Sequence, residues 1–407
     1  MRNCASITTV PHEGAQGDEG GDSMLDHIGS APNPAAQRTL PGRISQLDGL
    51  RGVAAFVVVV HHSLLVAPEL ARAYGVGRSD LTGWSWWLTH TPLHLLWDGP
   101  AAVFLFFVLS GFVLTLPFLG SRAPRWRDYY PRRLARLYLP VWGAVAFAVI
   151  LVLLVPRVSR PAQSWWVNLH AFHLGWSAIA TDAALVFGNT ALNTPLWSLQ
   201  WEVIFSLLLP LYLLVAVWLR RWWWLLLGLI FLTVQLRANA YAFYLPMFGI
   251  GAVMAVRRDV LDPIAGWLPR WAWPGLMLVS LLLINAKWYP VRIPGETLLT
   301  LAGVALMVFI FFGWGAMKRL GDARVVQWLG KRSFSLYLVH EPIVVSVAMA
   351  TATTNPLLVL AISAPVSLLV AAAFYRVVEY PAHLLSKKIS LPQRRMEAAE
   401  PGHARAS

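Results

Sequence analysis

The chain has 407 residues, of which 57% are hydrophobic and 13% are charged, and its formal net charge is +13. Because an average soluble domain carries about 25% charged residues, this composition excludes an ordinary soluble globular protein. A basic excess can indicate a nucleic-acid partner, but the Arg residues here sit in short segments between apolar runs, so nucleic-acid binding is not expected.

The first segment, residues 1–42, is rich in Gly, Pro, Ala, Asp and Glu and has no helical or strand period. We therefore expect a disordered cytoplasmic tail there. No apolar region follows Met1, so we expect no cleavable signal peptide, and Met24 is an alternative start. The single cysteine, Cys4, excludes an intrachain disulfide and a cysteine-based metal cluster.

Long apolar runs then recur along the chain, each near the roughly 20 residues that a helix needs to cross a bilayer. They are too long and too uniform for barrel strands, so the predicted fold is an all-α, polytopic bundle of about ten transmembrane helices. The predicted spans are 50–66, 100–118, 137–155, 198–219, 222–236, 241–256, 273–286, 298–316, 333–350 and 356–376.

The distribution of Lys and Arg predicts the orientation of these spans. If the N-terminus is cytoplasmic, the cytoplasmic connections hold sixteen Lys or Arg and the outward ones hold seven. The tail 387–407 is also basic, so we expect both termini in the cytoplasm of a multi-pass plasma-membrane protein.

Two of the outward connections are rich in tryptophan: Trp84, Trp86, Trp87 and Trp97 in one, and Trp165, Trp166 and Trp176 in the other. Such residues commonly form the aromatic belt at a membrane interface. Stacking against sugar rings is the alternative function.

The first predicted span carries ionisable residues, which are costly inside a bilayer and therefore indicate function. Asp48 and Arg51 stand at its inner mouth, and His61 and His62 lie deep within it. At about 100° per residue, Asp48, Arg51 and His62 share one stripe, while His61 points about 100° away. Arg51 and His62 are about 16 Å apart along the axis, which suits a long ligand that places phosphates at Arg51 and its reactive end at His62. The alternative is that His62 only bonds a neighbouring helix.

Other buried polar groups point to the same region. Glu202 is expected in the outer half of its span, where its carboxylate needs a cationic or hydrogen-bonding partner. His340 and Glu341 lie midway along another span, and Pro342 frees a backbone carbonyl there. We expect Glu379 to reach water or to pair with Arg376.

A basic cluster, Arg132, Arg133 and Arg136, follows Pro131 at the start of the third span. Arg132 and Arg136 are four residues apart and share a helix face. The cluster is typical of a bidentate phosphate site, although the determination of topology also explains basic residues there.

Seven motifs in order carry a resemblance to a known family: LDGLRGVAAFVVVVHH, FFVLSGFVL, YYPRRLARLYLP, NTPLWSLQWEVIFSLLLP, FYLPMFGIGAV, GKRSFSLYLVHEP and YRVVEYP. This succession resembles acyltransferase family 3, the membrane O-acyltransferases that include O-antigen acetylases and macrolide-acylating enzymes. The resemblance covers the domain 43–386 and implies ten transmembrane helices. It also implies catalytic roles for Arg51 and His62, an acyl-donor motif at Arg133 and Arg136, and a functional carboxylate at Glu202.

The residues and the resemblance together predict an O-acyltransferase that uses acyl-CoA, without a metal, to acylate a hydroxyl of a sugar or glycosylated acceptor. We assign catalysis to His62, Arg51, Asp48 and Glu202, donor binding to Arg132, Arg133 and Arg136, and acceptor binding to Trp197, His340 and Glu341. The alternative is a proton-coupled transporter or flippase, which also uses buried charges and a histidine at mid-membrane.

Overall fold

The computed structural model describes residues 44–75, 81–121 and 123–389, so the expected tail 1–42 and most of the tail 387–407 lie outside it. Within those residues all regular structure is helical, which confirms the all-α fold. The helices are α1 (Ser45–Leu64), α2 (Pro68–Gly75), α3 (Gly83–His90), α4 (Gly99–Thr115), α5 (Trp126–Leu154), α6 (Trp165–Leu169), α7 (Trp176–Ala184), α8 (Leu196–Trp218), α9 (Trp223–Leu236), α10 (Ala240–Val256), α11 (Arg258–Trp267), α12 (Ala272–Ile284), α13 (Glu296–Gly313), α14 (Gly315–Gly321), α15 (Arg324–Thr351), α16 (Pro356–Phe374) and α17 (Tyr380–Lys388). Short 3₁₀ turns form η2 (Pro92–Leu96), η3 (Leu116–Leu119), η4 (Arg220–Trp222) and η5 (Asn285–Trp288), and a π-helical turn, η6 (Tyr375–Glu379), joins α16 to α17.

Each of the ten predicted spans coincides with one of these helices, but not all of the helices are long enough to cross a bilayer. Seven helices in the described residues have the necessary length and hydropathy: α1, α4 with η3, α5, α8, α13, α15, and α16 continued through α17. The pair α10 and α11, bent by 69°, makes an eighth if it is one span. At about 1.5 Å per residue, α9 and α12 are shorter than a bilayer core of about 30 Å, so the count of ten is not confirmed.

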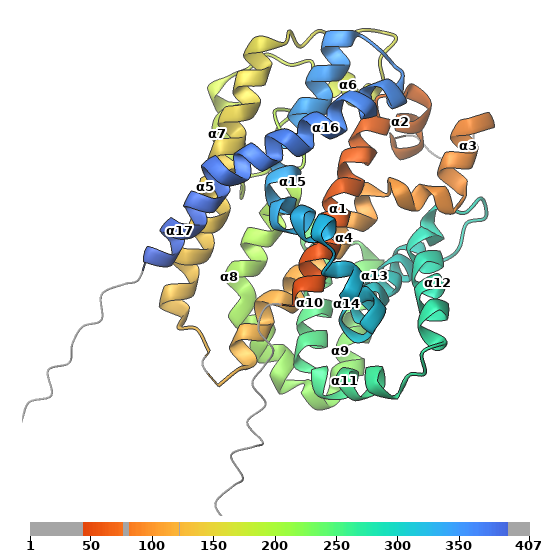
Figure 1. Ribbon diagram of the computed structural model, residues 1–407, viewed down its shortest axis with the longest axis vertical. Helices are drawn as coiled ribbons and strands as arrows, with labels where there is room; N and C mark the ends of the chain where they lie inside the picture. The colour runs from red at the N-terminus through yellow and green to blue at the C-terminus, as the bar shows by residue number, and fades with distance from the viewer. Residues whose placement is uncertain (1–43, 76–80, 122, 390–407) are drawn as a thin grey trace, which may run out of the picture. The chain divides into compact units, whose positions relative to one another are not determined.

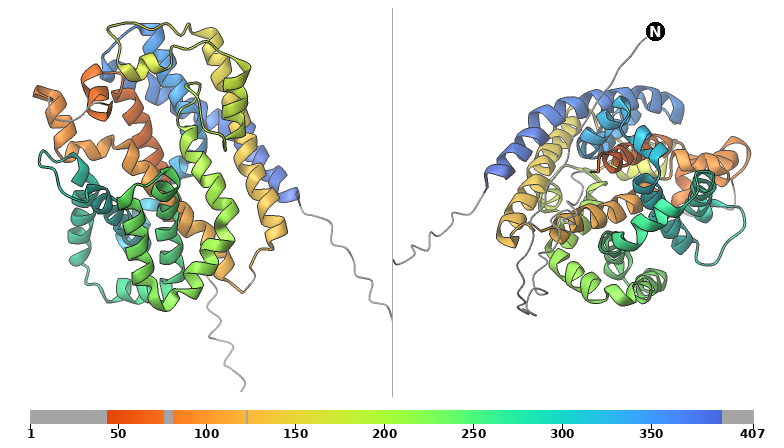
Figure 2. Two further views of the ribbon diagram at one scale, coloured as in Figure 1. Left: turned by 180° about the vertical axis from the view of Figure 1, so that it is seen from behind. Right: turned by 60° about the horizontal axis from the view of Figure 1, so that its bottom comes forward.

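The helices are arranged around α15, which is the most buried of the spans. In its most apolar stretch 78% of the residues are buried, against 28% for α16 with α17. Figures 1 and 2 accordingly show α16 and α17 on the outside of the bundle, with α15 inside. The outer helices keep apolar side chains exposed, as a lipid-facing surface requires; examples are Leu153, Leu214, Leu369 and Val377.

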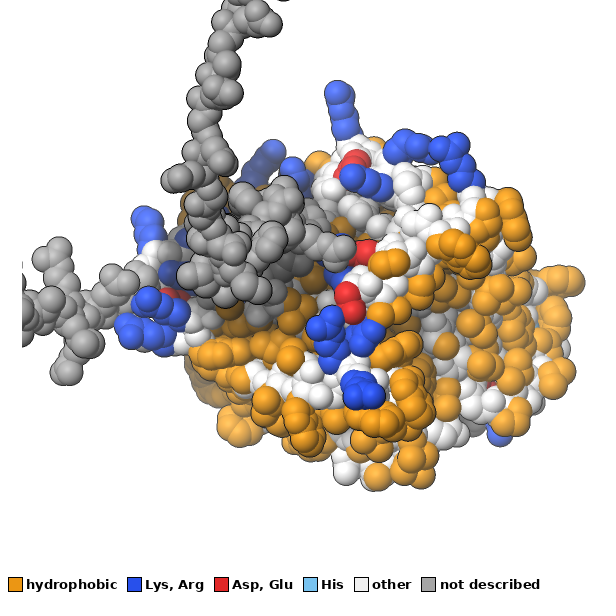
Figure 3. Space-filling view, turned by 90° about the horizontal axis from the view of Figure 1, so that it is seen from below, with side chains coloured by type: hydrophobic (Ala, Val, Ile, Leu, Met, Phe, Trp, Pro, Cys, Tyr) orange, Lys and Arg blue, Asp and Glu red, His pale blue; other side chains and the backbone are white. Residues whose placement is uncertain are grey.

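The two ends of the bundle differ in character. Figure 1 shows α2 and α6, which belong to the two tryptophan-rich connections, toward one end, and α11 at the opposite end. Figure 3 views the α11 end, where Lys and Arg side chains stand out from a surface with broad hydrophobic areas. Lys and Arg side chains therefore stand at the end that carries α11, opposite α2 and α6.

Candidate active site

Helices α1 and α15 pack backbone against backbone at two glycines. A Cβ atom at Gly52 would lie 2.5 Å from the Gly330 nitrogen, and one at Gly330 would collide with the Asp48 carbonyl oxygen. Only residues without a Cβ allow this approach. Ten residues after these glycines stand His62 and His340. Because equal steps along two parallel helices give equal rises, the glycine contact places the two histidines at the same depth.

The two imidazoles are joined by a hydrogen bond. His62 Nδ1 lies 2.8 Å from His340 Nε2, and the ring centroids are 5.0 Å apart. His340 is completely buried, and its Nδ1 lies 3.1 Å from the carbonyl oxygen of Leu336, one turn back on α15. His62 is only half-buried. The histidine that the sequence selects as the base therefore bonds a neighbouring helix and also keeps part of its ring accessible, so the two alternatives for His62 do not exclude each other.

The indole ring of Trp166 covers the other side of His62. The two rings are stacked, with centroids 5.3 Å apart and an interplanar angle of 15°, and Trp166 is buried. Ser164 holds α6 in place, since its hydroxyl donates to the Leu65 carbonyl and accepts from the Val167 amide. This tryptophan of the second outward connection is therefore a wall of the site, a role that neither alternative for the tryptophans included.

His61 faces different neighbours, as the helical geometry predicted. Its Nδ1 lies 2.9 Å from the carbonyl oxygen of Trp97, and its ring packs edge-on against Tyr74. Trp97 is also fully buried. Of the tryptophans in the two outward connections, Trp84, Trp87, Trp165 and Trp176 are exposed enough to contribute to an interfacial belt.

Glu341 points toward the connection that precedes α8. Its carboxylate accepts hydrogen bonds from the backbone amide and the hydroxyl of Thr194, and it lies 3.3 Å from His170 Nε2. Glu341 and His170 are both buried. The immediate role of Glu341 is therefore to anchor residues 156–195 onto α15, beside the paired histidines.

The carbonyl that Pro342 frees has a partner, as the sequence suggested. Pro342 has no amide hydrogen to bond the Leu338 carbonyl, and Asn193 Nδ2 donates to that oxygen at 3.0 Å. Asn193 is fully buried. The connection before α8 thus supplies the hydrogen bond that the backbone of α15 lacks at Leu338, in the middle of the helix.

Arg51 lies near the carboxylate of Glu379. Glu379 accepts from the amide and hydroxyl of Ser335, at 3.1 and 2.5 Å, and interacts electrostatically with Arg51 and Arg136. The sequence analysis expected Glu379 to reach water or to pair with Arg376, and did not anticipate its hydrogen bonds to Ser335 of α15. Arg51 Nε is buried and has no hydrogen-bond partner among the described residues.

Arg133 forms an ion pair with Glu202. Ser206 accepts from Arg133 Nε at 3.3 Å, and Ser110 donates to Glu202 at 3.4 Å. Glu202 therefore has the cationic partner that the sequence required. Glu202 lies in the first half of α8, within the outer half of its predicted span, and the ion pair brings Arg133 of α5 to the same level of the bundle.

Helix α8 begins inside the bundle. The two residues just before its first turns, Asn193 and Thr194, bond Leu338 and Glu341 in the middle of α15. Residues 156–195 therefore enter the bundle and contact the middle of α15 before α8 starts.

Two further predicted residues have other neighbours. Arg132 Nε donates to the carbonyl oxygen of Ile389 at the end of α17, at 2.9 Å. Arg132 and Arg136 thus both face the α16–α17 segment, as their spacing predicted. The aromatic neighbours of Trp197 are Tyr244 and Phe107, so its ring belongs to a different cluster from that of His62 and His340.

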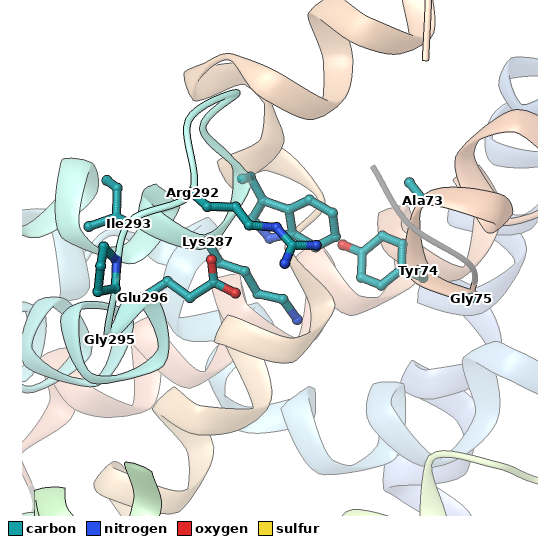
Figure 4. A pocket seen from close by; sticks show the side chains of 10 residues that line it. Ala73, Tyr74, Gly75, Lys287, Arg292, Ile293, Gly295 and Glu296 are labelled. Carbon is teal, nitrogen blue, oxygen red and sulfur yellow. The ribbon is translucent and has the colours of Figure 1, made fainter. Parts of the chain in front are cut away.

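A pocket of about 530 Å³ lies between α2 and the segment that joins α12 to α13. Lys287, Arg292 and Glu296 reach into it from one side, and Tyr74 from the other (Figure 4). The buried ring of Trp288 also lines it. The pocket combines charged groups with two aromatic rings, which is typical of a site for a polar ligand.

A buried polar cluster, missed by the sequence analysis, includes Tyr74 and Trp288, which line this pocket. The Tyr74 hydroxyl lies 2.9 Å from His94 Nε2, and Trp288 Nε1 donates to Asp98 at 3.2 Å. Burial raises the pKa of Tyr74 well above its usual range and raises that of Asp98 from 3.8 to about 6. The ring of His61 packs against Tyr74, which lines the pocket, and also against the ring of His62. The ring of His61 therefore connects the wall of the pocket to His62.

The sequence of the chain matches known acyltransferases over most of its length. The sequence profile of a family described as an acyltransferase domain matches residues 44–376. Acyltransferase MdmB of Streptomyces mycarofaciens is 27% identical in an alignment 336 residues long, which covers 73% of this chain and 78% of that protein. O-acetyltransferase PaAT-1 of Phomopsis amygdali is 23% identical over 78% of this chain and 76% of its own length.

A third relative, the peptidoglycan O-acetyltransferase OatA of Listeria monocytogenes, is 22% identical. The match spans 77% of this chain but only 51% of that protein. No solved structure matches the chain.

Proposed function

Because the chain belongs to acyltransferase family 3 and is therefore an acyltransferase, we propose that it transfers a short acyl group from acyl-CoA to a hydroxyl of a carbohydrate or glycosylated acceptor. Two relatives are named O-acetyltransferases, and one of these acts on peptidoglycan, a carbohydrate polymer. The observation that carries the proposal is the hydrogen bond between the partly exposed His62 and the buried His340, with Trp166 stacked on His62.

The donor enters from the basic end of the bundle. Arg133 and Arg136 bind its phosphates together with Arg51, whose buried Nε has a hydrogen left to donate. Glu202 and Glu379 hold this group of arginines in place, and Asp48 supports Arg51 one turn away. Arg132 stabilises the start of α5 through its hydrogen bond to the Ile389 carbonyl at the end of α17.

The thioester of the bound donor then reaches His62, about 16 Å further along α1. The imidazole takes the proton of the acceptor hydroxyl as its oxygen attacks the thioester carbonyl carbon. A new C–O bond forms, the C–S bond breaks, and the leaving thiolate takes the proton from the imidazolium to give free CoA. Transfer through a transient acyl-enzyme has the same balance and remains the second route.

The acceptor arrives from the opposite, tryptophan-rich end. The pocket beside Tyr74 and Trp288 offers ring surfaces to a sugar, and Lys287 and Arg292 suit an acceptor that also carries an anionic group. Glu341 and Trp197 act indirectly on this side, Glu341 by anchoring the connection that carries Trp166.

A labelled acyl-CoA assay on the full chain in lipid nanodiscs tests the proposal. We expect acceptor-dependent release of free CoA together with acylated product from a panel of glycans and glycosylated small molecules. The proton-coupled transporter, the rival function, would move a solute across a vesicle membrane and leave the thioester intact. That result, with no thiol released, would refute the proposed reaction.

The orientation is also a proposal, with both termini on the cytoplasmic side of the plasma membrane. Cys4, the single cysteine of the chain, allows a direct test. A membrane-impermeant maleimide should label Cys4 only after the cells are permeabilised, and labelling in intact cells would reverse the assigned topology.

A further inference from the structure

The hydrogen bonds of His340 determine which of its ring nitrogens carries the hydrogen. Its Nδ1 lies 3.1 Å from the backbone carbonyl oxygen of Leu336. A carbonyl oxygen can only accept a hydrogen bond, so Nδ1 of His340 must be the donor. In the neutral ring the other nitrogen, Nε2, is then an acceptor.

The tautomer of His340 also determines the tautomer of His62. His62 Nδ1 lies 2.8 Å from the acceptor nitrogen Nε2 of His340, so the hydrogen of neutral His62 must be on Nδ1. The lone pair of His62 is therefore on Nε2. Among the described residues no hydrogen bond engages that atom, and the ring that carries it is half-buried, whereas His340 is completely buried.

We propose that His340 is a positioning residue that holds His62 in the Nδ1–H tautomer, so that Nε2 is the nitrogen that accepts the proton of the acceptor hydroxyl. The proposal rests on the proposed function, in which His62 is the base. When Nε2 of His62 takes the proton, the Nδ1–H bond to His340 persists, so the imidazolium is stabilised without any movement of the rings. The proton later leaves from the same Nε2 to the departing thiolate.

The same bonds make His340 unsuited to relay the proton onward. A relay through His340 would have to deliver a proton from its Nδ1 to the next group, and that nitrogen faces a backbone carbonyl, which is not a base. The reaction needs no such path, because the thiolate takes up the proton that the hydroxyl loses.

Two substitutions at one position separate this role from simple packing. In His340→Gln, the amide oxygen Oε1 extends about as far along the side chain as Nε2 does and can still accept from His62 Nδ1–H. His340→Phe keeps the ring volume but removes the acceptor. We expect kcat to fall at least about 100-fold in His340→Phe, with the KM for acyl-CoA unchanged within about twofold, because only the base is disturbed. The glutamine variant should stay within about tenfold of the wild-type kcat.

The tautomer itself can be read from the ¹⁵N shifts of labelled histidine in the full chain in nanodiscs, with the His62 signals identified by their loss in His62→Ala. We expect a protonated Nδ1 and a bare Nε2 for His62 in the wild type and in His340→Gln, and a mixture of tautomers in His340→Phe. Thermal unfolding identifies any variant that fails to fold. The exposed His173 supplies a control, since His173→Gln should change neither kcat nor the His62 signals.

A bare Nδ1 on His62 in the wild type would overturn the inference, as would full kcat in a folded His340→Phe. These outcomes leave the proposed function standing as long as His62→Ala is inactive. Full activity in His62→Ala would instead refute the proposed function, whatever the tautomer.

Discussion

Gly52 and Gly330 touch backbone to backbone, and this contact sets the register in which His62 of α1 meets His340 of α15. Both histidines stand ten residues beyond their glycines, so a shift of one helix by a single residue would move the rings apart by about 1.5 Å and rotate them by about 100°. A hydrogen bond of 2.8 Å does not survive such a shift. The catalytic geometry therefore depends on two residues about 15 Å away that have no side chain.

Substitution at this crossing should disturb both stability and catalysis. In Gly330→Ala the new Cβ meets the Asp48 carbonyl, so we expect a loss of about 1–3 kcal/mol in the free energy of unfolding together with a lower kcat. Gly228 on α9 is the matched control, because a Cβ there meets open space, and Gly228→Ala should gain up to about 1 kcal/mol from helix propensity. Thermal unfolding in detergent and the acyl-CoA assay measure both effects. Equal stability of the two variants would contradict the backbone contact.

Removal of the proposed base should abolish transfer without unfolding the protein. His62→Ala should lower kcat by about 10²–10⁴-fold, since that is the usual contribution of a general base. Binding of acyl-CoA, measured by calorimetry, should persist because the phosphate-binding arginines are intact. Residual activity near the wild-type level in this variant would remove His62 from the mechanism.

Substitutions in the ion pair between Arg133 and Glu202 should separate the effect on stability from the effect on donor affinity. Arg133→Ala should destabilise the protein by up to about 3–5 kcal/mol, because it leaves the carboxylate buried without its cation. It should also raise the KM for acyl-CoA by about 10–100-fold through the loss of a charged hydrogen bond to phosphate. In the swapped variant, Arg133→Glu with Glu202→Arg, stability should return and donor affinity should not. Recovery of both would indicate that Arg133 serves only the ion pair.

Asn193 and Pro342 form a pair whose substitutions should not be additive. Asn193→Leu leaves the buried Leu338 carbonyl without a partner, which should cost about 1–3 kcal/mol. With Pro342→Ala in the same chain, the amide of residue 342 can bond that carbonyl again, so the added cost of Asn193→Leu should shrink. A double-mutant cycle on the unfolding midpoint gives the coupling, and a coupling of zero would contradict the assignment.

Asp98 should make stability depend on pH. Burial raises its pKa from 3.8 to about 6, so the folded protein holds this proton over a range in which the unfolded chain has lost it. The contribution of Asp98 is therefore fully present below about pH 4 and is lost as the pH rises to about 6, by about 3 kcal/mol in total.

The comparison of wild type with Asp98→Asn isolates this term. Asparagine can still cap Ala101, as Asp98 does through the start of α4, but it does not titrate. We expect the wild type to lose stability relative to the variant between about pH 4 and pH 6, with a flat difference above that range. A difference that grows in the opposite direction would show that the carboxylate is stabilised as an anion.

The sequence predicted the positions of the helices better than the contacts between them. Every apolar run became a helix, because the bilayer requires backbone hydrogen bonds to close within one segment. Hydropathy could not reveal that residues 156–195 enter the bundle and bond α15 before α8 begins, or that Glu202 of α8 meets Arg133 of α5. The lengths of α9 and α12 likewise left the number of spans at seven or eight.

Within the site, the sequence identified groups but not all of their partners. His62, Arg51 and Glu202 stood out because an ionisable residue in a bilayer is costly. Trp166 was seen only as one of the outward tryptophans, and Glu379 was expected to reach water or to pair with Arg376. The contacts of Trp166 with His62 and of Glu379 with Ser335 join distant segments and leave no local signal in the sequence.

The residue pattern alone determined that the chain is a bundle of membrane helices. It also determined that Asp48, Arg51 and His62 share one stripe of the first helix. Both follow from hydropathy and helical angle, which are local properties of the sequence. Only the tertiary structure decided that His62 meets His340, that Arg133 meets Glu202 and that Trp166 covers the imidazole. These contacts join segments that are far apart in the chain. The register between the segments is set by packing at residues such as Gly52 and Gly330, which allow the close approach because they have no Cβ atom.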